Sequence, residues 1–148
     1  MKIPHFFRFN SLRKEGFDVE YERGTAADYF RALANGEESF FTGVGNFLDD
    51  FYSASGDEKE RLISQPIDLD LVTDDNLRYA AFFSGMVESL CLQYVLNRPD
   101  WIWEERYRLR NPWFLYEGWR LRAWQLVTTP PSFKARNIFG GDNMLSRV

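Results

Sequence analysis

The chain has 148 residues, of which 45% are hydrophobic, 18% aromatic and 27% charged, and its formal net charge is −4. So many apolar residues exclude a disordered or collagen-like chain, and the length predicts a single globular domain over residues 1–148. The one cysteine, Cys91, excludes an internal disulfide, and together with the single histidine it provides too few ligands for a zinc site.

The predicted elements begin with a strand and a short helix. Residues 17–22 alternate apolar and acidic side chains, which is typical of a half-buried strand. Thr25 then has the hydroxyl of a good helix N-cap, with Asp28 at the third helical position. The pair Asn35-Gly36 is a suitable stop signal. These signals predict a short first helix between them.

Two further helices are predicted in the first half of the chain. Apolar residues within 40–52 recur at the spacing of one helical face, and Ser55-Gly56 closes the pattern. Asp57 then has the features of an N-cap for a short helix that ends before Pro66.

The longest apolar stretch predicts the central element of the fold. Thr73 is a strong N-cap signal, because the acidic residues that follow it favour the positive end of a helix dipole. The helix is predicted to span about residues 74–97. Apolar residues occupy most of its circumference, so we expect it to be buried and the other helices to pack around it. Polar side chains such as Glu88 argue against a membrane span.

Two later segments also alternate with a period of two residues. In residues 67–72 apolar residues alternate with aspartates, and in residues 101–109 they alternate with arginines, apart from Glu105. Strict alternation predicts half-buried strands, so residues 17–22, 67–72 and 101–109 are candidates for a minor two- or three-stranded sheet. The predicted fold class is therefore mainly α, one compact helical domain with at most this small sheet.

The last third of the chain is predicted to contain one more helix and several turns. Asn111-Pro112 is a typical cap and first-turn proline, which predicts a helix over residues 113–127. The two prolines after residue 129 end it. Residues 132–139 predict one helical turn, and the glycine pair that follows them predicts a tight turn.

The most concentrated chemical signal is a segment rich in tryptophan and arginine. All five tryptophans lie within residues 101–124, among five arginines, and residues 98–148 carry nine lysines or arginines against five acidic residues. Trp and Arg dominate the energetics of protein interfaces, so we interpret the segment as a partner-binding surface. Its candidate residues are Trp101, Trp103, Arg106, Arg108, Arg110, Trp113, Trp119, Arg120 and Arg122.

Two other interpretations of this segment remain open. The rings can form a structural lid on the central helix, with the arginines paired to Asp18, Glu20 and Glu22 in the acidic part of the chain. Arginines on phosphates and rings stacked on bases would instead make a nucleic-acid site. An isoelectric point near 5.1 opposes that second alternative.

Signals for catalysis are sparse. Asp68 and Asp70 would share one face of a strand and could hold a divalent metal, and this D-x-D pattern resembles that of nucleotidyltransferases. The resemblance covers three residues and implies a metal-dependent phosphotransferase as an alternative function. Glu88 lies among apolar residues and needs a partner if it is buried, for which a C-terminal arginine is the candidate. The main interpretation includes no catalytic residue, no metal ligand and no cofactor.

The sequence therefore favours binding over catalysis. We expect a small intracellular protein-interaction module, of a regulatory or antitoxin-like kind, that uses the surface at residues 101–124. A protein partner is expected first and nucleic acid second, with no membrane, and the oligomeric state is left open. The single cysteine and the charged N-terminal residues predict a cytoplasmic location.

Overall fold

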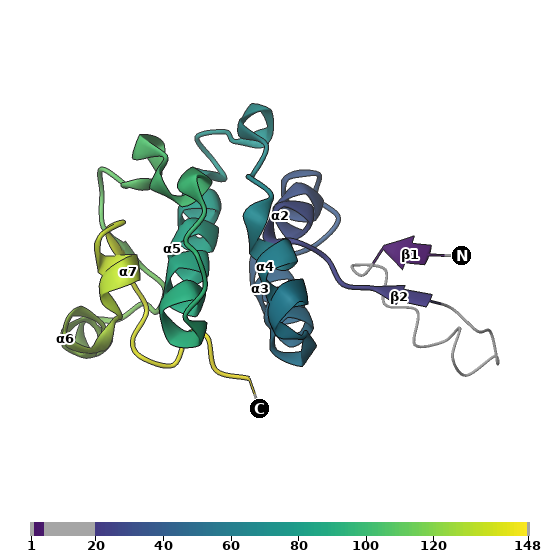
Figure 1. The fold of residues 1–148 in the computed structure, drawn as a ribbon. Coiled ribbons are helices and arrows are strands. Elements are labelled where there is room, and N and C mark those ends of the chain that lie inside the picture. Colours follow the sequence, from purple (N-terminus) through teal and green to yellow (C-terminus); the bar gives the residue numbers. More distant parts are fainter. Residues whose placement is uncertain (1, 5–19, 148) are drawn as a thin grey trace, which may run out of the picture.

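The computed structural model describes residues 2–4 and 20–147, and its fold is mainly α, as predicted. Three helices lie together on one side of the molecule: α2 (Ala26–Ala34), α3 (Phe40–Ser53) and α4 (Gly56–Ser64). Helix α5 (Leu77–Tyr94) stands in the middle (Figure 1). On its other side lie α6 (Trp119–Thr128) and α7 (Pro131–Lys134) (Figure 1).

Helix α2 begins and ends where the sequence predicts. The Thr25 hydroxyl accepts a hydrogen bond from the Asp28 amide at 3.0 Å, and the Asp28 carboxylate accepts one from the Thr25 amide at 3.1 Å. This reciprocal capping box satisfies two amides that would otherwise have no partner at the helix start. At the other end Asn35 is the C-cap, and Gly36 adopts a φ of +75°, which glycine reaches without a steric cost.

Helix α3 confirms the predicted amphipathic helix, and α4 confirms the predicted short helix before Pro66 with its N-cap displaced. Helix α3 buries the face that includes Phe47. Helix α4 begins before Asp57, because the Ser55 hydroxyl accepts the hydrogen bond of the Glu58 amide at 3.4 Å. Asp57 therefore lies in the first turn, where its charge still favours the helix dipole.

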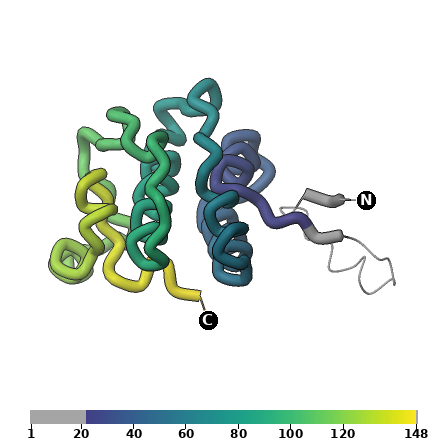
Figure 2. The backbone as a smooth tube through the Cα atoms, in the orientation of Figure 1, coloured from purple at the N-terminus to yellow at the C-terminus, as the bar shows by residue number. Residues whose placement is uncertain are grey.

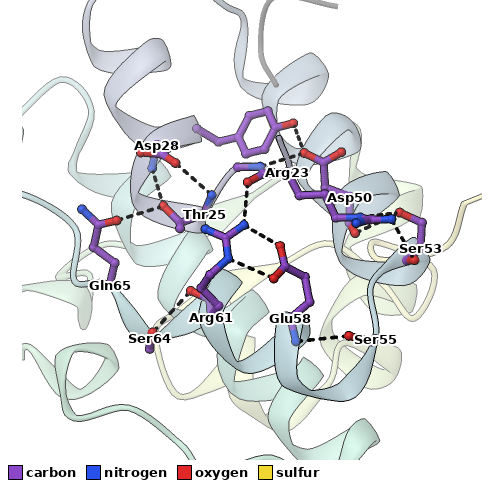
Figure 3. A network of polar contacts seen from close by, with 12 residues as sticks. Arg23, Thr25, Asp28, Asp50, Ser53, Ser55, Glu58, Arg61, Ser64 and Gln65 are labelled. Carbon is purple, nitrogen blue, oxygen red and sulfur yellow. Dashed lines mark hydrogen bonds and ion pairs between the residues drawn. The ribbon is translucent and has the colours of Figure 1, made fainter. Parts of the chain in front are cut away.

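Polar contacts fasten α2, α3 and α4 to the segment that leads into α2 (Figure 3). The buried Asp50 carboxylate of α3 accepts hydrogen bonds from the Tyr29 hydroxyl at 2.6 Å and from the Gly24 amide at 3.2 Å. The Arg61 guanidinium of α4 donates to the Arg23 carbonyl at 2.9 Å. These bonds fix the relative positions of three helices that the sequence places one after another.

Helix α5 is the central element that the sequence predicts, but it is shorter at both ends. Ten of its residues are buried. It begins at Leu77, because Thr73 and Asn76 first exchange side chain-to-backbone hydrogen bonds of 2.7 and 3.3 Å and close a separate turn. It ends at Tyr94, because Val95 takes a left-handed conformation. Neither α5 nor another helix in the described residues is both long and apolar enough to cross a membrane.

Two minor two-stranded sheets are present in the described residues, but their members differ from the predicted ones. Strand β2 (Glu20–Glu22) falls within the predicted segment 17–22 and pairs in parallel with β1 (Lys2–Pro4). Residues 17–19 lie outside the described part of the chain.

The predicted strands at residues 67–72 and 101–109 are wrong. These segments contain three short 3-10 helices, η1 (Leu69–Leu71), η2 (Asp100–Trp103) and η3 (Glu105–Tyr107). In η1 the Asp68 carboxylate accepts a hydrogen bond from the Asp70 amide at 3.0 Å, a local bond that competes with strand pairing. In η2 and η3 the buried residues are Ile102 and Tyr107. In residues 101–109 the apolar alternation therefore comes from two successive turns that each bury one side chain and contact α5.

The helix predicted over residues 113–127 begins only at Trp119. Trp113–Phe114 forms β3, which pairs in parallel with β4 (Ile138–Phe139). Gly118 then precedes α6 with a φ of +107°, where an L side chain would be strained. Strand pairing with residues 138–139 therefore outweighs the local helix-start signal of Asn111-Pro112. The predicted helical turn is confirmed as α7.

The chain after β4 turns back and runs past the end of α5 to the α3 side (Figure 2). The turn uses Gly141, whose φ is +85°, as the glycine pair predicts. The Tyr52 hydroxyl of α3 then donates to the Leu145 carbonyl at 2.7 Å, and Arg147 pairs with Asp49 at 3.0 Å. The C-terminal segment thus joins the two sides of the fold.

Candidate partner-binding surface

The nine residues predicted to bind a partner lie in four places. Trp101 and Trp113 pack against the core. Trp103, Arg106 and Arg108 lie on or beside the turns η2 and η3, whereas Trp119, Arg120 and Arg122 belong to α6. Arg110 is exposed on the segment between η3 and β3. The segment 101–124 therefore contributes to more than one surface.

Trp101 and Trp113 are mainly structural. The Trp101 indole N–H donates to the Ile63 carbonyl at 2.8 Å and so ties η2 to the end of α4. The Trp113 ring lies 5.5 Å from the ring of Phe40 and 5.7 Å from that of Tyr79, between centroids. These contacts are those of a lid on the core, which is one of the interpretations that the sequence leaves open.

Trp103 is held between guanidinium groups on the turn side of the molecule. Its side chain is 51% exposed. The guanidinium carbons of Arg98 and Arg136 lie 5.8 and 5.6 Å from its ring centroid, within the range of cation–π attraction. Arg106 forms an exposed ion pair with Glu104 at 3.3 Å.

Glu88 has the arginine partner that the sequence analysis expects: Arg136 pairs with it closely, and Arg98 lies farther away at 3.8 Å. The Arg136 Nη1 lies 2.6 Å from the Glu88 Oε1. The same buried guanidinium donates to the Ser84 hydroxyl at 2.7 Å and to the Ile102 carbonyl at 2.9 Å. It therefore joins α5, η2 and the residues after α7, and this role is structural.

Helix α6 has apolar residues on its outer face and a polar residue on its inner face. Trp119 is 78% exposed, Val127 76% and Leu126 47%. Gln125 is fully buried. With about 100° per helical residue, Trp119, Leu126 and Val127 lie within an arc of about 100° that also includes Ala123. We call Trp119, Ala123, Leu126 and Val127 the outer face of α6. Sequence reasoning missed Leu126 and Val127 as candidates.

Gln125 is buried because its amide completes the hydrogen bonding of the segment before α6. Its Oε1 accepts from the Tyr116 amide at 3.1 Å, and its Nε2 donates to the carbonyls of Tyr116 at 3.0 Å and Leu121 at 3.1 Å. The neighbouring Trp124 ring packs directly on the backbone of Gly141. These contacts fix the inner face of α6 and leave the outer face to solvent.

The arginines beside the outer face form no ion pair within the described part of the chain. The Arg120 guanidinium carbon lies 5.4 Å from the Trp119 ring centroid, and that of Arg122 lies 4.9 Å from the centroid of Phe114. Arg108 and Arg110 likewise have no carboxylate partner among the described residues. Four guanidinium groups are thus available to a negatively charged partner.

The acidic residues expected to neutralise these arginines lie elsewhere. Glu20 and Glu22 belong to β2, which lies at the opposite end of the molecule from α6 (Figure 1). Asp18 lies outside the described residues. The expectation that Glu22 covers the arginines of α6 is therefore wrong, and the Glu20 side chain lies outside the described part of the chain.

Asp68 and Asp70 do not form the carboxylate pair that the strand interpretation requires. Both are exposed, and the Asp68 carboxylate is occupied by the Asp70 amide at the start of η1. Within residues 2–4 and 20–147 there is no group of three side chains that could hold a metal ion. The geometric premise of a metal-dependent transferase is therefore wrong.

Cys91 behaves as the small buried hydrophobe that its apolar neighbours predict. Its thiol lies 3.6 Å from the Asn97 carbonyl. Burial raises the pKa of Cys91 to about 11, with a further contribution from the nearby Glu88, while Arg98 opposes the shift. The thiol is therefore protonated at neutral pH and is a poor nucleophile.

Comparison of the chain with protein-family models, with curated proteins and with solved structures gives no match. The functional argument consequently depends on the geometry of the chain itself. Its strongest feature is the outer face of α6.

Proposed function

We propose that the protein is a protein-interaction module that binds its partner through the outer face of α6. The observation that carries the proposal is the exposure of this helix's apolar side chains: Trp119 and Val127 are more than three-quarters exposed, although Gln125 of the same helix is fully buried. A helix on the surface of a folded protein normally turns its apolar side inward. Contiguous exposed apolar residues rimmed by polar ones mark interaction sites.

The size of the apolar face determines what else the interface needs. Burial of a large apolar side chain contributes about 1.5–3 kcal/mol. Trp119, Leu126 and Val127 would therefore contribute roughly 4–9 kcal/mol together, which is comparable to the roughly 4–15 kcal/mol that association costs in lost freedom. The apolar face alone gives weak binding, so polar contacts at its rim are required.

We propose that the partner presents an apolar groove with acidic residues along its edges. Arg120 and Arg122 project on opposite sides of the outer face, as the helical period of 3.6 residues requires. Both lack a carboxylate partner in the described residues. A carboxylate on the partner would form charge-assisted hydrogen bonds with them, and such bonds are about twice as strong as neutral ones.

Nucleic acid is a weaker candidate for the same face. Trp119 could stack on a base, but Leu126 and Val127 have no group that recognises a phosphate or a base edge. The net charge of −4 also opposes the approach of a polyanion. Nucleic-acid binding is therefore kept as an outcome of the test below.

We place this interaction in the cytoplasm. The single cysteine supports that location, because proteins of oxidising compartments more often carry paired, disulfide-bonded cysteines. Recovery of the native protein only from exported or membrane fractions would contradict the proposed location.

The experiment compares two double variants of the full chain. Trp119→Ser/Val127→Ser removes the outer face, and Phe41→Ser/Leu92→Ser is the matched control, because Phe41 and Leu92 are 65% and 58% exposed elsewhere. Tagged wild type and both variants are incubated with native lysate, and the retained proteins are identified. We expect a partner that wild type and control retain and that the outer-face variant loses at least ten-fold.

Affinity measurements with the retained partner then test the charge of the rim. Arg120→Gln/Arg122→Gln should slow association and reduce its dependence on salt, because rim charges act mainly on the association rate. Equal retention of all proteins by the two double variants would contradict the proposal. Retention that nuclease treatment abolishes would assign the face to nucleic acid instead. Self-association of the wild type that the outer-face variant loses would assign it to a second copy of the chain.

A further inference from the structure

Residues 142–147, the C-terminal segment, lie against α3 in the manner of a bound peptide. They form neither helix nor strand, and most of them are exposed. Within the described part of the chain, one hydrogen bond joins their backbone to a helix, and it is donated by the Tyr52 hydroxyl of α3 to the Leu145 carbonyl at 2.7 Å. Side-chain contacts therefore determine most of the position of the segment.

The Arg147 guanidinium lies directly over Gly45, where α3 has no side chain. A β-carbon on Gly45 would lie 2.9 Å from the Arg147 Nη1 and 3.0 Å from both Cζ and Nη2. A β-carbon on Gly43, two residues earlier in the same helix, would meet no heavy atom of the described residues within 4 Å. Glycine weakens the interior of a helix. The contact with Arg147 gives the glycine at position 45 a role that offsets this weakness.

Asp49 makes this contact specific for arginine. The Arg147 Nε and Nη2 donate to the Asp49 Oδ1 and Oδ2 at 3.0 and 3.2 Å. Such a bidentate pair fits the planar guanidinium, and the ammonium group of lysine cannot reproduce it. With about 100° per helical residue, Gly45, Asp49 and Tyr52 lie within an arc of about 60° on α3. One face of the helix therefore contacts a guanidinium and the main-chain carbonyl of the residue two positions before it.

The contacts that hold the C-terminal segment can be exchanged for those of another chain. The side chains of Arg147 and Asp49 are 44% and 38% exposed, so water and salt compete with their ion pair. Met144 and Leu145 pack against the core but are only partly buried. Release of the segment breaks no strand pairing and no buried ion pair among the described residues. A separate chain with the same side chains can therefore form the same contacts.

We propose that this face of α3 is a peptide-binding site for an arginine that follows an apolar residue by two positions, and that the C-terminal segment occupies it as a reversible intramolecular ligand. The partner that fits is a protein with an exposed segment of this pattern. Such a partner competes with the chain's own segment, whose tether gives it an effective concentration of the order of millimolar. The site shares no residue with the outer face of α6, so it does not depend on the proposed function.

The test titrates the full chain with a peptide that has the sequence of residues 142–147 and is blocked at both ends. The host is Arg147→Ala, whose own segment lacks the arginine, and the readout is the NMR signal of the Asp49 amide. We expect a saturable shift of this signal at millimolar peptide. Wild type should bind the peptide roughly ten-fold more weakly, because its own tethered segment competes. A peptide with lysine in place of the arginine should bind Arg147→Ala roughly five-fold more weakly.

Two glycine variants in the Arg147→Ala background locate the site. Gly45→Ala should weaken peptide binding roughly five-fold, because its methyl group displaces the guanidinium from its bidentate geometry. Gly43→Ala is the matched control, since it favours the helix equally but leaves the site open, and it should bind as Arg147→Ala does. The proposal is overturned if the peptide gives no saturable shift, if the lysine peptide binds as well, or if the two glycine variants bind equally. Equal binding by wild type and Arg147→Ala would overturn the occupation of the site by the C-terminal segment.

Discussion

The Arg136 Nη1 lies 2.6 Å from the Glu88 Oε1, and the two side chains are only 4% and 12% exposed. The pair joins α5 to the residues after α7, which are far apart in the sequence. Neither charge can be solvated well if the other is removed. Loss of one member of a buried pair therefore costs more than the pair contributes when it is intact.

Arg136→Met is expected to lower the free energy of unfolding by about 3–5 kcal/mol. It removes the hydrogen bonds to Ser84 and the Ile102 carbonyl and leaves the Glu88 carboxylate with only the more distant Arg98, at 3.8 Å. Arg136→Met/Glu88→Leu should be less destabilised than the sum of its single variants, because no charge remains buried. Arg106→Met is the control, since its pair with Glu104 is exposed, and it should lose less than about 1 kcal/mol. Urea denaturation measures the wild type, Arg136→Met, Glu88→Leu, the double variant and Arg106→Met. Additive effects of the two buried substitutions would show that the groups do not interact.

Gln125→Leu is expected to destabilise the fold by about 2–4 kcal/mol, although it places an apolar side chain in a buried position. The substitution leaves the partly buried Tyr116 amide and carbonyl without the partners they have in Gln125. An unsatisfied buried group costs about 1–3 kcal/mol, and partial burial keeps the two losses near the lower end of that range. Trp119→Ser and Val127→Ser should each change stability by less than about 0.5 kcal/mol, because both residues are exposed. A loss in Trp119→Ser as large as that in Gln125→Leu would show that Trp119 is packed, and would remove the basis of the proposed interface.

Gln125 also shows what the sequence could and could not predict. Helices whose apolar face turns inward, such as α3, follow from their periodicity and caps. In α6 the apolar arc faces outward, and what directs the helix is a set of amide hydrogen bonds to Tyr116 that periodicity does not encode. The presence of this helix is therefore predictable in part from the sequence. Which of its faces points to solvent can be read only from the structure.

The errors in the predicted strands have a similar cause. Residues 101–109 have the period of a strand, but Ile102 and Tyr107 are buried by separate turns against α5. The pair of Arg147 with Asp49 likewise joins residues 98 positions apart, so no local pattern indicates it. Sequence reasoning predicted that Glu88 needs an arginine, because a buried charge must be paired, but not which arginine supplies it.

Gly141→Ala is expected to destabilise the protein more than Gly36→Ala does. Both glycines have a positive φ, +85° and +75°, so each alanine costs about 1 kcal/mol in backbone strain. A β-carbon at Gly36 meets no heavy atom within 4 Å, whereas one at Gly141 overlaps the Trp124 ring. We therefore expect Gly141→Ala to lose at least about 1–3 kcal/mol more, the usual cost of overpacking. Urea denaturation measures the difference, and equal losses would contradict the packing of Trp124 on this turn.

Val95→Gly is expected to stabilise the protein by about 1 kcal/mol. Val95 ends α5 with a φ of 54°, and it is 90% exposed, so its side chain contributes little packing. A β-branched residue is strained in this conformation, which glycine adopts freely. Leu92→Gly is the matched control, because Leu92 is exposed within the body of the same helix, and it should lose about 1 kcal/mol. Thermal unfolding measures the midpoint temperature of each variant. A shift of both midpoints in the same direction would contradict this account of the helix end.

The Cys91 thiol is expected to make stability fall as the pH rises above neutrality. Burial raises its pKa in the folded protein to about 11, whereas an unfolded cysteine has a pKa of about 8.5. Below about pH 8.5 both states keep the proton, so the contribution of the thiol to stability is fully present there. Between that pH and about 11 the unfolded chain loses the proton and the folded chain keeps it, so the free energy of unfolding decreases as the pH rises.

The decrease due to Cys91 should approach about 3 kcal/mol when complete, since each unit of difference in pKa corresponds to about 1.4 kcal/mol. Cys91→Ala has a lower free energy of unfolding at every pH, because its core side chain is smaller. Its free energy of unfolding does not change with the ionisation of a thiol, because the variant has none at this position. The stability difference between wild type and Cys91→Ala should therefore shrink as the pH is raised from 7 toward about 10.5. Tyr107, whose pKa is also raised by burial, contributes equally to both proteins and cancels in the comparison. Urea denaturation across this range measures the difference, and a difference independent of pH would show that the Cys91 thiol is not buried in the folded state.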